Sequence, residues 1–258
     1  MSNIHKQKFE EYCAIEIGKA QQFITEKITV GGTKKKIIRL IPNKPFFLLA
    51  KDLAKEKAQH TMSASQAGIE RTLSEKEIKQ FEGVLAEQMT HMFLLSVLQQ
   101  NEVLRFDIER PNFQYDRNEY DLKIFDSTRK IEYTMEARNS TSYKTTIEEF
   151  YTLYDVIIAY TNDLKTSEKP NSFYIRPVIQ YATKQPSMPR HTSIDTLIDN
   201  LMRGEVIAYL TCGVGTEIVR EKAYLKSMGQ GRTQYAAVKM IDALDINEFV
   251  KLIRATVQ

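Results

Sequence analysis

Tryptophan is absent from this sequence, and cysteine is scarce. The 258 residues include two cysteines, Cys13 and Cys212, which stand far apart. No C-x-x-C pair or Cys/His cluster occurs, and the four histidines show no paired ligand spacing, so a structural zinc site is not expected. Two distant cysteines in such a chain predict reduced thiols and an intracellular, cytoplasmic protein.

Long apolar runs are missing as well. The stretch MSNIHKQKFEEY is charged and contains no apolar signal segment. No stretch approaches the ~20 consecutive apolar residues that a membrane span requires. We therefore expect a protein without a membrane partner.

Several catalytic motifs are also missing. The stretch TCGVGTE, residues 211–217, follows an apolar run. It lacks the third glycine of a dinucleotide fingerprint and the Gly-Lys-Ser/Thr of a P-loop, so Gly213 and Gly215 are interpreted as turn glycines. No G-x-S-x-G elbow occurs, and neither cysteine has a recognisable base partner in the sequence. Acyl transfer and the common nucleotide-dependent chemistries therefore have no motif to support them.

The composition that is present suits a folded domain. Hydrophobic residues make up 42% of the chain and charged residues 27%, with a net charge of +3 and a pI near 8.6. These values are ordinary for a globular protein with one well-filled core. The mildly basic balance is compatible with nucleic acid, although a metabolic enzyme would look the same.

The hydrophobic periodicity predicts an α/β fold, with a mixed β-sheet flanked by helices. The expected helices cover residues 3–22, 45–60, 75–100, 145–163, 193–205 and 246–258. The expected strands are two runs flanking Gly31-Gly32, followed by strands over 103–111, 119–126, 130–138, 172–182, 206–215 and 233–244. Ser74 and Glu77 form a capping-box pattern before the longest helix, and Pro177 predicts an edge strand or a bulge.

The expected order of helices and strands divides the chain into two regions. Residues 1–73 form an N-terminal extension of helix and basic β-hairpin, which is a candidate for DNA contact. The polar stretch 61–74 predicts a loop or linker. Residues 74–258 contain the mixed sheet and its helices.

Acidic and basic side chains alternate with apolar ones in the strand KIEYTMEAR. Glu136 and Arg138 share one face because they stand two residues apart in an extended chain. Asp121 lies in the preceding strand, which a short turn joins to this one. Two carboxylates meeting on neighbouring strands can hold Mg²⁺, and a cation beside them can stabilise charge that develops on a phosphate.

The order of these elements resembles the PD-(D/E)xK nucleases, the superfamily of most type II restriction endonucleases. The resemblance covers roughly residues 74–182. It implies a restriction-endonuclease-like fold with Asp121 and Glu136 as Mg²⁺ ligands and Glu87 as an additional ligand. It places Arg138 where the family has lysine. It further implies a site-specific deoxyribonuclease that cuts double-stranded DNA, and a palindromic target would match a homodimer.

Two residues depart from the family pattern. Tyr120 precedes Asp121 where the family has proline. Arg138 cannot deprotonate water, because the pKa of arginine stays above about 12. Lys123 and Lys144 are nearby cations that could replace it. The alternative is a non-catalytic DNA-binding or protein-interaction module on the same scaffold.

Several cationic residues are candidates for DNA contact through phosphate groups. They are Lys34, Lys35, Lys36 and Arg39 in the hairpin, Lys144 after the acidic strand, Lys184 and Arg190 in a proline-containing loop, and Arg232 in a glycine-containing loop. For the hairpin, a solvated edge strand protected by lysines is an equally good interpretation. The two loops can also be ordinary surface connections.

Overall fold

The structure is a computed structural model, and it describes most of the chain. The described residues are 3–16, 22–60, 71–98, 102–105, 120–126, 128–161, 170–187, 193–227 and 234–257.

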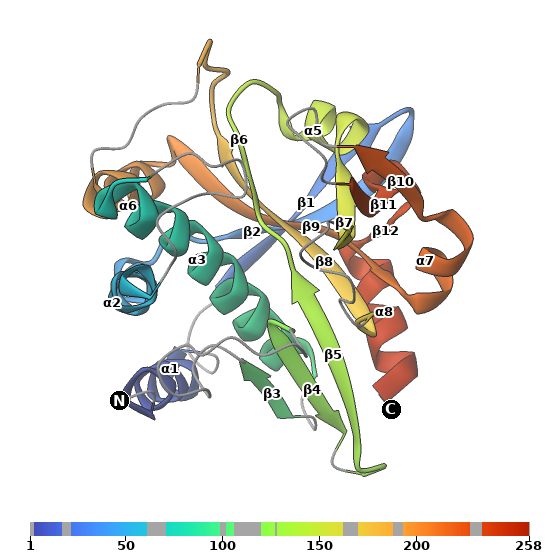
Figure 1. Ribbon diagram of the computed structural model, residues 1–258, viewed down its shortest axis with the longest axis horizontal. Helices are drawn as coiled ribbons and strands as arrows, with labels where there is room; N and C mark the ends of the chain where they lie inside the picture. Colours follow the sequence, from blue (N-terminus) through green and yellow to red (C-terminus); the bar gives the residue numbers. More distant parts are fainter. Residues whose placement is uncertain are drawn as a thin grey trace.

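Helices and strands alternate irregularly along the chain (Figure 1). The helices are α1 (Asn3–Glu16), α2 (Lys44–Gln59), α3 (Leu73–Val97), α5 (Ile147–Leu153), α6 (Ile194–Arg203), α7 (Thr216–Lys222) and α8 (Ile246–Val257), with a 3-10 turn η2 (Met240–Asp242). The strands are β1 (Phe23–Val30), β2 (Thr33–Leu40), β3 (Glu102–Arg105), β4 (Leu122–Asp126), β5 (Ile131–Ala137), β6 (Ser140–Ser142), β7 (Asp155–Thr161), β8 (Phe173–Tyr181), β9 (Val206–Gly215), β10 (Tyr224–Ser227), β11 (Gln234–Lys239) and β12 (Leu244–Asp245).

A nine-stranded mixed sheet forms the centre of the molecule. Its order is β1-β2-β9-β8-β5-β4-β3, with β12 pairing with β9 and β6 pairing with β8. The β5–β8 and β6–β8 pairs are parallel, whereas the other pairs in this sheet are antiparallel. A second sheet has the order β10-β11-β7. The prediction of a mixed α/β fold with a helix-flanked sheet is therefore confirmed.

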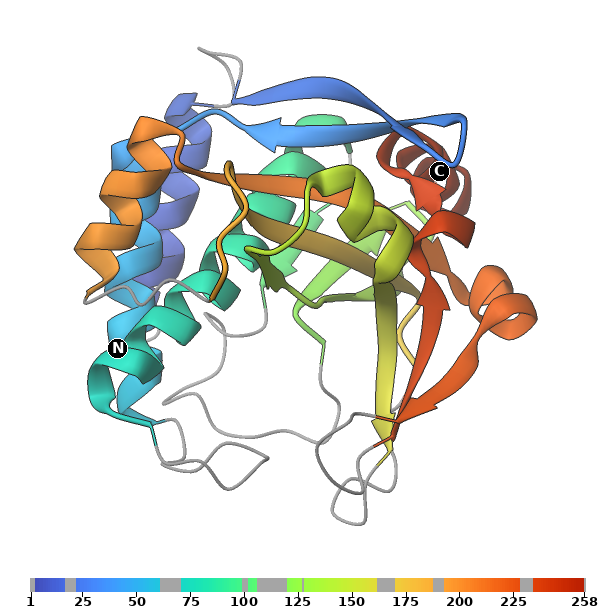
Figure 2. The same cartoon turned by 90° about the horizontal axis from the view of Figure 1, so that it is seen from above.

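The two cores lie on opposite faces of the central sheet, because successive side chains of a strand point to opposite faces. In β9, Ala208 and Leu210 join the larger cluster, which is shared with α1, α2, α3, α6 and α8. Tyr209 in the same strand joins the smaller cluster, which is shared with α5, β7 and β11. Figure 2 shows the helices α1, α2 and α6 grouped at one end of the molecule.

The basic hairpin is an integral part of the sheet. Gly31 and Gly32 adopt φ values of +54° and +80°, which confirms the tight glycine turn. Beyond the turn, Ile38 pairs with Leu210 of β9. The strands of the N-terminal region 1–73 therefore complete the same sheet as the strands of region 74–258.

The helix ends match the sequence signals with one shift. The longest helix begins at Leu73, and its capping box uses Thr72 and Glu75 in place of Ser74 and Glu77. The expected helix over 193–205 is confirmed as α6, which Ser193 caps and which ends at Gly204 in a left-handed conformation with φ +74°. The predicted linker lies outside the described residues over 61–70. Among the helices that are described, none is long and apolar enough to cross a membrane.

The predicted helix over 145–163 is wrong in its second half. Helix α5 ends at Leu153, and the chain continues as β7. Strand β7 pairs with β11, for example Val156 with Val238. A run of β-branched residues, Val156 to Ile158, favours this extended backbone and outweighs the helical spacing of the aromatic residues.

Gly213 and Gly215 are not turn glycines, because both lie within strand β9. A Cβ atom at Gly213 would lie 2.6 Å from ring atoms of Phe249, and one at Gly215 would lie 2.8 Å from Leu252. Both glycines therefore allow α8 to pack closely against the sheet. Pro177 lies at a register shift in β8, a strand inside the sheet, so the bulge interpretation is confirmed and the edge interpretation is wrong.

Candidate active site

Asp121 and Glu136 approach each other at the junction of β4 and β5. Leu122 pairs with Met135 across these strands, and the Asp121 N–H donates to the Met135 carbonyl at 3.0 Å. The Asp121 carboxylate in turn accepts a 2.7 Å hydrogen bond from the Ala137 N–H. Asp121 is therefore fixed to the backbone of the strand that carries Glu136.

Glu136 and Arg138 form an ion pair on the polar face of β5. The Arg138 Nε donates to Glu136 Oε1 at 2.9 Å, and the two side chains are only 14% and 15% exposed. Asn171, which is buried just before β8, donates to the other carboxylate oxygen of Glu136 at 3.3 Å. Both carboxylate oxygens of Glu136 are thus oriented by neighbouring side chains.

Burial and charge repulsion alter the acidity of Asp121. Burial, together with a smaller contribution from the nearby Glu136 charge, raises the pKa of the Asp121 carboxyl from 3.8 to about 7. Three groups oppose this rise and lower the pKa of Asp121: the Ala137 N–H, Lys57 and Arg138. The charged form of Asp121 is therefore disfavoured in the folded protein, which is the condition that a bound cation relieves.

Lys57 is a cation of the site that sequence reasoning missed. It lies in the last turn of α2, and its Nζ is 3.6 Å from Glu87 Oε1 of α3. The two side chains are 14% and 11% exposed. The positive charge of Lys57 also acts on Asp121, whose pKa it lowers. Because Lys57 precedes the acidic strands by a helix and a long intervening segment, no local pattern indicates its position.

Arg176 holds the backbone where β5 ends. Its guanidinium donates to the Arg138 carbonyl at 2.8 Å and to the Ser140 hydroxyl at 2.6 Å. Arg176 is buried in β8, next to the register shift at Pro177. Arg176 therefore fixes the chain direction immediately after Arg138. Its contribution, like that of Asn171, depends on the bulge and on the parallel pairing of β5 with β8.

Lys123 and Lys144, the other cations considered for the site, contact other side chains in the structure. Lys123 pairs with Glu132 at 3.1 Å and lies 5.1 Å from the ring centroid of Tyr120. Lys144 is exposed and lies 5.6 Å from the ring centroid of Tyr143. The charge of Lys57, in contrast, acts on Asp121.

The predicted DNA-contacting residues are spread over several parts of the surface. Lys34 is exposed on β2, whereas Lys35 donates to the Ala243 carbonyl at 3.1 Å, and Arg39 forms an ion pair with Glu26. The Lys36 side chain is half-buried.

In the loop after β8, Lys184 pairs with Glu149 at 2.6 Å. Arg190 and Arg232 lie outside the described residues.

The donor set fits Mg²⁺ as a partial shell of oxygen ligands. Mg²⁺ is held in many enzymes by one or two carboxylates, and water and phosphate oxygens complete the coordination. Asp121 and Glu136 supply such a pair. In the part of the chain that the structure describes, no three His, Cys, Asp or Glu side chains gather closely enough to hold a metal. The assignment of Glu87 as a further ligand stays a prediction, and Glu87 forms an ion pair with Lys57.

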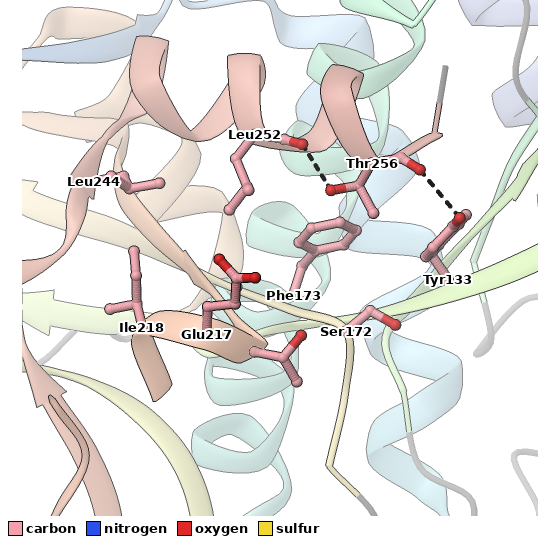
Figure 3. A pocket seen from close by; sticks show the side chains of 10 residues that line it. Tyr133, Ser172, Phe173, Glu217, Ile218, Leu244, Leu252 and Thr256 are labelled. Carbon is pink, nitrogen blue, oxygen red and sulfur yellow. Dashed lines mark hydrogen bonds between the residues drawn. The ribbon is translucent and has the colours of Figure 1, made fainter. Parts of the chain in front are cut away.

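A separate cavity of about 480 Å³ lies between β8, α7 and α8 (Figure 3). Phe173, Leu252 and Ile218 line its apolar part, and Glu217 projects into it. The Tyr133 hydroxyl closes one side by donating to the Thr256 carbonyl at 3.1 Å. The lining includes Ser172, the neighbour of Asn171, but none of the three candidate metal ligands.

Comparisons of this chain with protein-family models, with curated proteins and with solved structures each found no match. The geometry of the site therefore carries the functional argument alone.

Proposed function

We propose that this protein is a Mg²⁺-dependent endonuclease that hydrolyses phosphodiester bonds of double-stranded DNA, built on a restriction-endonuclease-like fold. The observation that carries the proposal is the approach of Asp121 and Glu136 beside the cations Arg138 and Lys57. Phosphodiester hydrolysis requires carboxylates that bind a cation and positive groups that stabilise the phosphate.

The reaction converts one diester into a monoester and a hydroxyl group. The oxygen of a water molecule forms a bond to phosphorus while the bond from phosphorus to a sugar oxygen breaks. The water loses one proton to solvent, and the departing sugar oxygen gains one. Bound Mg²⁺ supplies Lewis-acid polarisation of a phosphate oxygen. Asp121 and Glu136 would hold it in an orientation fixed by Ala137 and Asn171.

Arg138 contributes positive charge in this scheme, and it does not accept a proton. Its pKa lies far above neutral, so its guanidinium stays charged throughout the reaction. A planar guanidinium can bind a phosphate through two parallel hydrogen bonds. Its pairing with Glu136 at 2.9 Å keeps it beside the carboxylates.

Sequence-specific cleavage of a palindromic target would require two copies of this site related by a two-fold axis. We propose a homodimer for this reason.

Incubation of supercoiled plasmid with the purified protein and Mg²⁺ tests the proposal directly. The wild type is expected to give discrete linear fragments, and EDTA is expected to prevent cleavage. Glu136→Gln keeps the size of the side chain but removes its charge, so cleavage should fall by about 10³-fold or more while DNA binding persists. A control variant, Glu217→Gln, changes a carboxylate of the separate cavity and should cleave normally.

The alternative is a module that binds DNA without cutting it. The direct pairing of Arg138 with Glu136 favours it, because each group partly neutralises the other. A wild type that binds plasmid but never cleaves it with Mg²⁺ or Mn²⁺ would establish this alternative. A wild type that binds no DNA at low salt would overturn both.

Lysines on β1 and β2 provide a candidate surface for phosphate contact. Lys27 lies directly opposite Lys36, and Lys34 lies two residues along the same strand face. Like charges in directly opposed positions destabilise a sheet. An anionic partner would remove this repulsion.

Lys36→Thr is therefore expected to act in two directions. Loss of the repulsion should raise the free energy of unfolding by roughly 0.2–1 kcal/mol. Loss of one phosphate contact should weaken DNA binding and reduce the salt dependence of log K by about one unit. Chemical denaturation and fluorescence anisotropy over a salt series measure these effects. Lys222→Thr on α7 serves as the control, and an equal loss of binding in both variants would contradict a specific contact at β2.

A further inference from the structure

Lys57 is the candidate-site cation that comes from outside the acidic strands. Helix α2 packs against α3, and α3 contacts β5. The ion pair of Lys57 with Glu87 places the last turn of α2 beside α3. Ala54 and Ala58, on either side of Lys57, are buried and fix the rotation of the helix. The position of Lys57 is therefore set by packing.

Lys57 forms an ion pair with Glu87, in which Lys57 Nζ and Glu87 Oε1 lie 3.6 Å apart. The positive charge of Lys57 also acts on the Asp121 carboxylate. An ammonium group has three donors on a flexible stem, so Lys57 can direct one towards a phosphate while it keeps the attraction of Glu87.

From this arrangement we propose that Lys57 is a catalytic residue, whose ammonium group binds the phosphate undergoing hydrolysis and stabilises the negative charge of its transition state. This inference rests on the proposed nuclease function. It assigns to α2, in the N-terminal region, the lysine that is absent from the acidic strand. In this assignment Glu87 is the partner that positions Lys57.

The role requires a fixed positive charge close to the reacting phosphate. Lys57 is largely buried, and in such surroundings an ionic contact is stronger than at an exposed surface. Removal of one preorganised group that stabilises a transition state typically lowers the rate by 10²–10³-fold. The effect should therefore appear mainly in the rate of cleavage and only weakly in DNA affinity.

Lys57→Ala and Lys55→Ala form a matched pair for the test. Both lysines lie on α2, but Lys55 is exposed. In single-turnover plasmid cleavage with Mg²⁺, Lys57→Ala should be slower than the wild type by about 100-fold or more. Lys55→Ala should stay within about twofold of the wild type, as expected for a surface substitution. Lys57→Arg should retain part of the rate, because it keeps the charge but changes its geometry.

DNA binding in EDTA supplies a second readout that does not depend on metal or cleavage. Lys57→Ala should reduce the slope of log K against log salt by about one unit, and Lys55→Ala should leave the slope unchanged. An unchanged slope together with a wild-type cleavage rate in Lys57→Ala would overturn the proposal while leaving the nuclease function intact. If the wild type does not cleave, the proposed function and this inference are both rejected.

Chemical restoration separates a catalytic role from a structural one. Cys13 and Cys212 are both buried, so alkylation of folded Lys57→Cys with 2-bromoethylamine is directed to position 57. The product carries an ammonium group on a side chain of almost the original length. Recovery of at least about a tenth of the wild-type rate is expected, since the group that stabilises the transition state is restored. A failure to recover in a protein shown by mass spectrometry to be modified, and by thermal unfolding to be folded, would contradict the proposal.

Discussion

Replacing Asp121 by Asn is expected to stabilise the metal-free protein at pH 8 while it abolishes DNA cleavage. The pKa of Asp121 is raised from 3.8 to about 7, because the carboxyl group is buried beside Glu136. At pH 8 the folded protein therefore contains a charged group that its surroundings disfavour. Asparagine removes the charge, and its side-chain oxygen can still accept the hydrogen bond from the Ala137 N–H.

The sign of the pH dependence follows from the same shift. Between pH 4 and 7 the folded protein retains a proton on Asp121 that the unfolded chain has already released. Stability contributed by this group is thus present below pH 4 and decreases as the pH rises to about 7. At pH 8, Asp121→Asn should exceed the wild type by roughly 2–4 kcal/mol in free energy of unfolding, and the difference should vanish near pH 3.

Urea denaturation of the wild type and of Asp121→Asn at several pH values in EDTA measures this difference. Addition of Mg²⁺ should stabilise the wild type and leave Asp121→Asn nearly unchanged, because a ligand that binds the folded state raises its stability. A difference that is independent of pH, or a variant less stable than the wild type at pH 8, would show that Asp121 is not a disfavoured charge.

Gly213→Ala is expected to produce the largest loss of stability by a single methyl group. The new Cβ atom would lie 2.6 Å from three ring atoms of Phe249, which is fully buried. Helix α8 or the ring must move, and overpacking of this kind usually costs 1–3 kcal/mol or more. We expect a loss of roughly 3 kcal/mol by urea denaturation.

Two further variants show whether the collision with Phe249 causes the loss. Phe249→Leu shortens the ring side chain, so the double variant Gly213→Ala/Phe249→Leu should be more stable than the sum of the two single effects predicts. Gly83→Ala in α3 meets no atom within 4 Å and should stabilise the helix by roughly 0.5–1 kcal/mol. Additive effects at positions 213 and 249 would contradict the close-packing explanation.

The pair Asp121 and Glu136 could be predicted from the sequence because its position depends on short-range geometry. Glu136 and Arg138 stand two residues apart in a strand, and Asp121 stands in the strand joined to it by a turn. The alternation of apolar and polar residues was enough to place all three on one side. Lys57 and Asn171 were not accessible, because their positions depend on helix packing and on the pairing of β5 with β8.

The errors in the predicted fold have the same origin. The aromatic spacing of residues 145–163 suits a helix, but the pairing of β7 with β11 joins segments far apart in the chain. Thr72-Glu75 and Ser74-Glu77 both match the capping-box pattern, so the sequence alone does not select between them. The sequence around Gly213 suggests a turn because the helix that approaches this glycine, α8, follows much later in the chain.

The hairpin at one edge of the central sheet has a consequence for synthesis of the protein. The N–H of Lys36 donates to the carboxylate of Asp245, which is 209 residues later. On the ribosome, β1 and β2 emerge long before β9 and β12, and the edge of β2 that pairs with β9 stays unpaired throughout that interval. Contacts of such long range form slowly, and an unpaired strand edge can recruit other chains. Nascent chains of this protein should therefore depend on chaperones until the C-terminal third has been made.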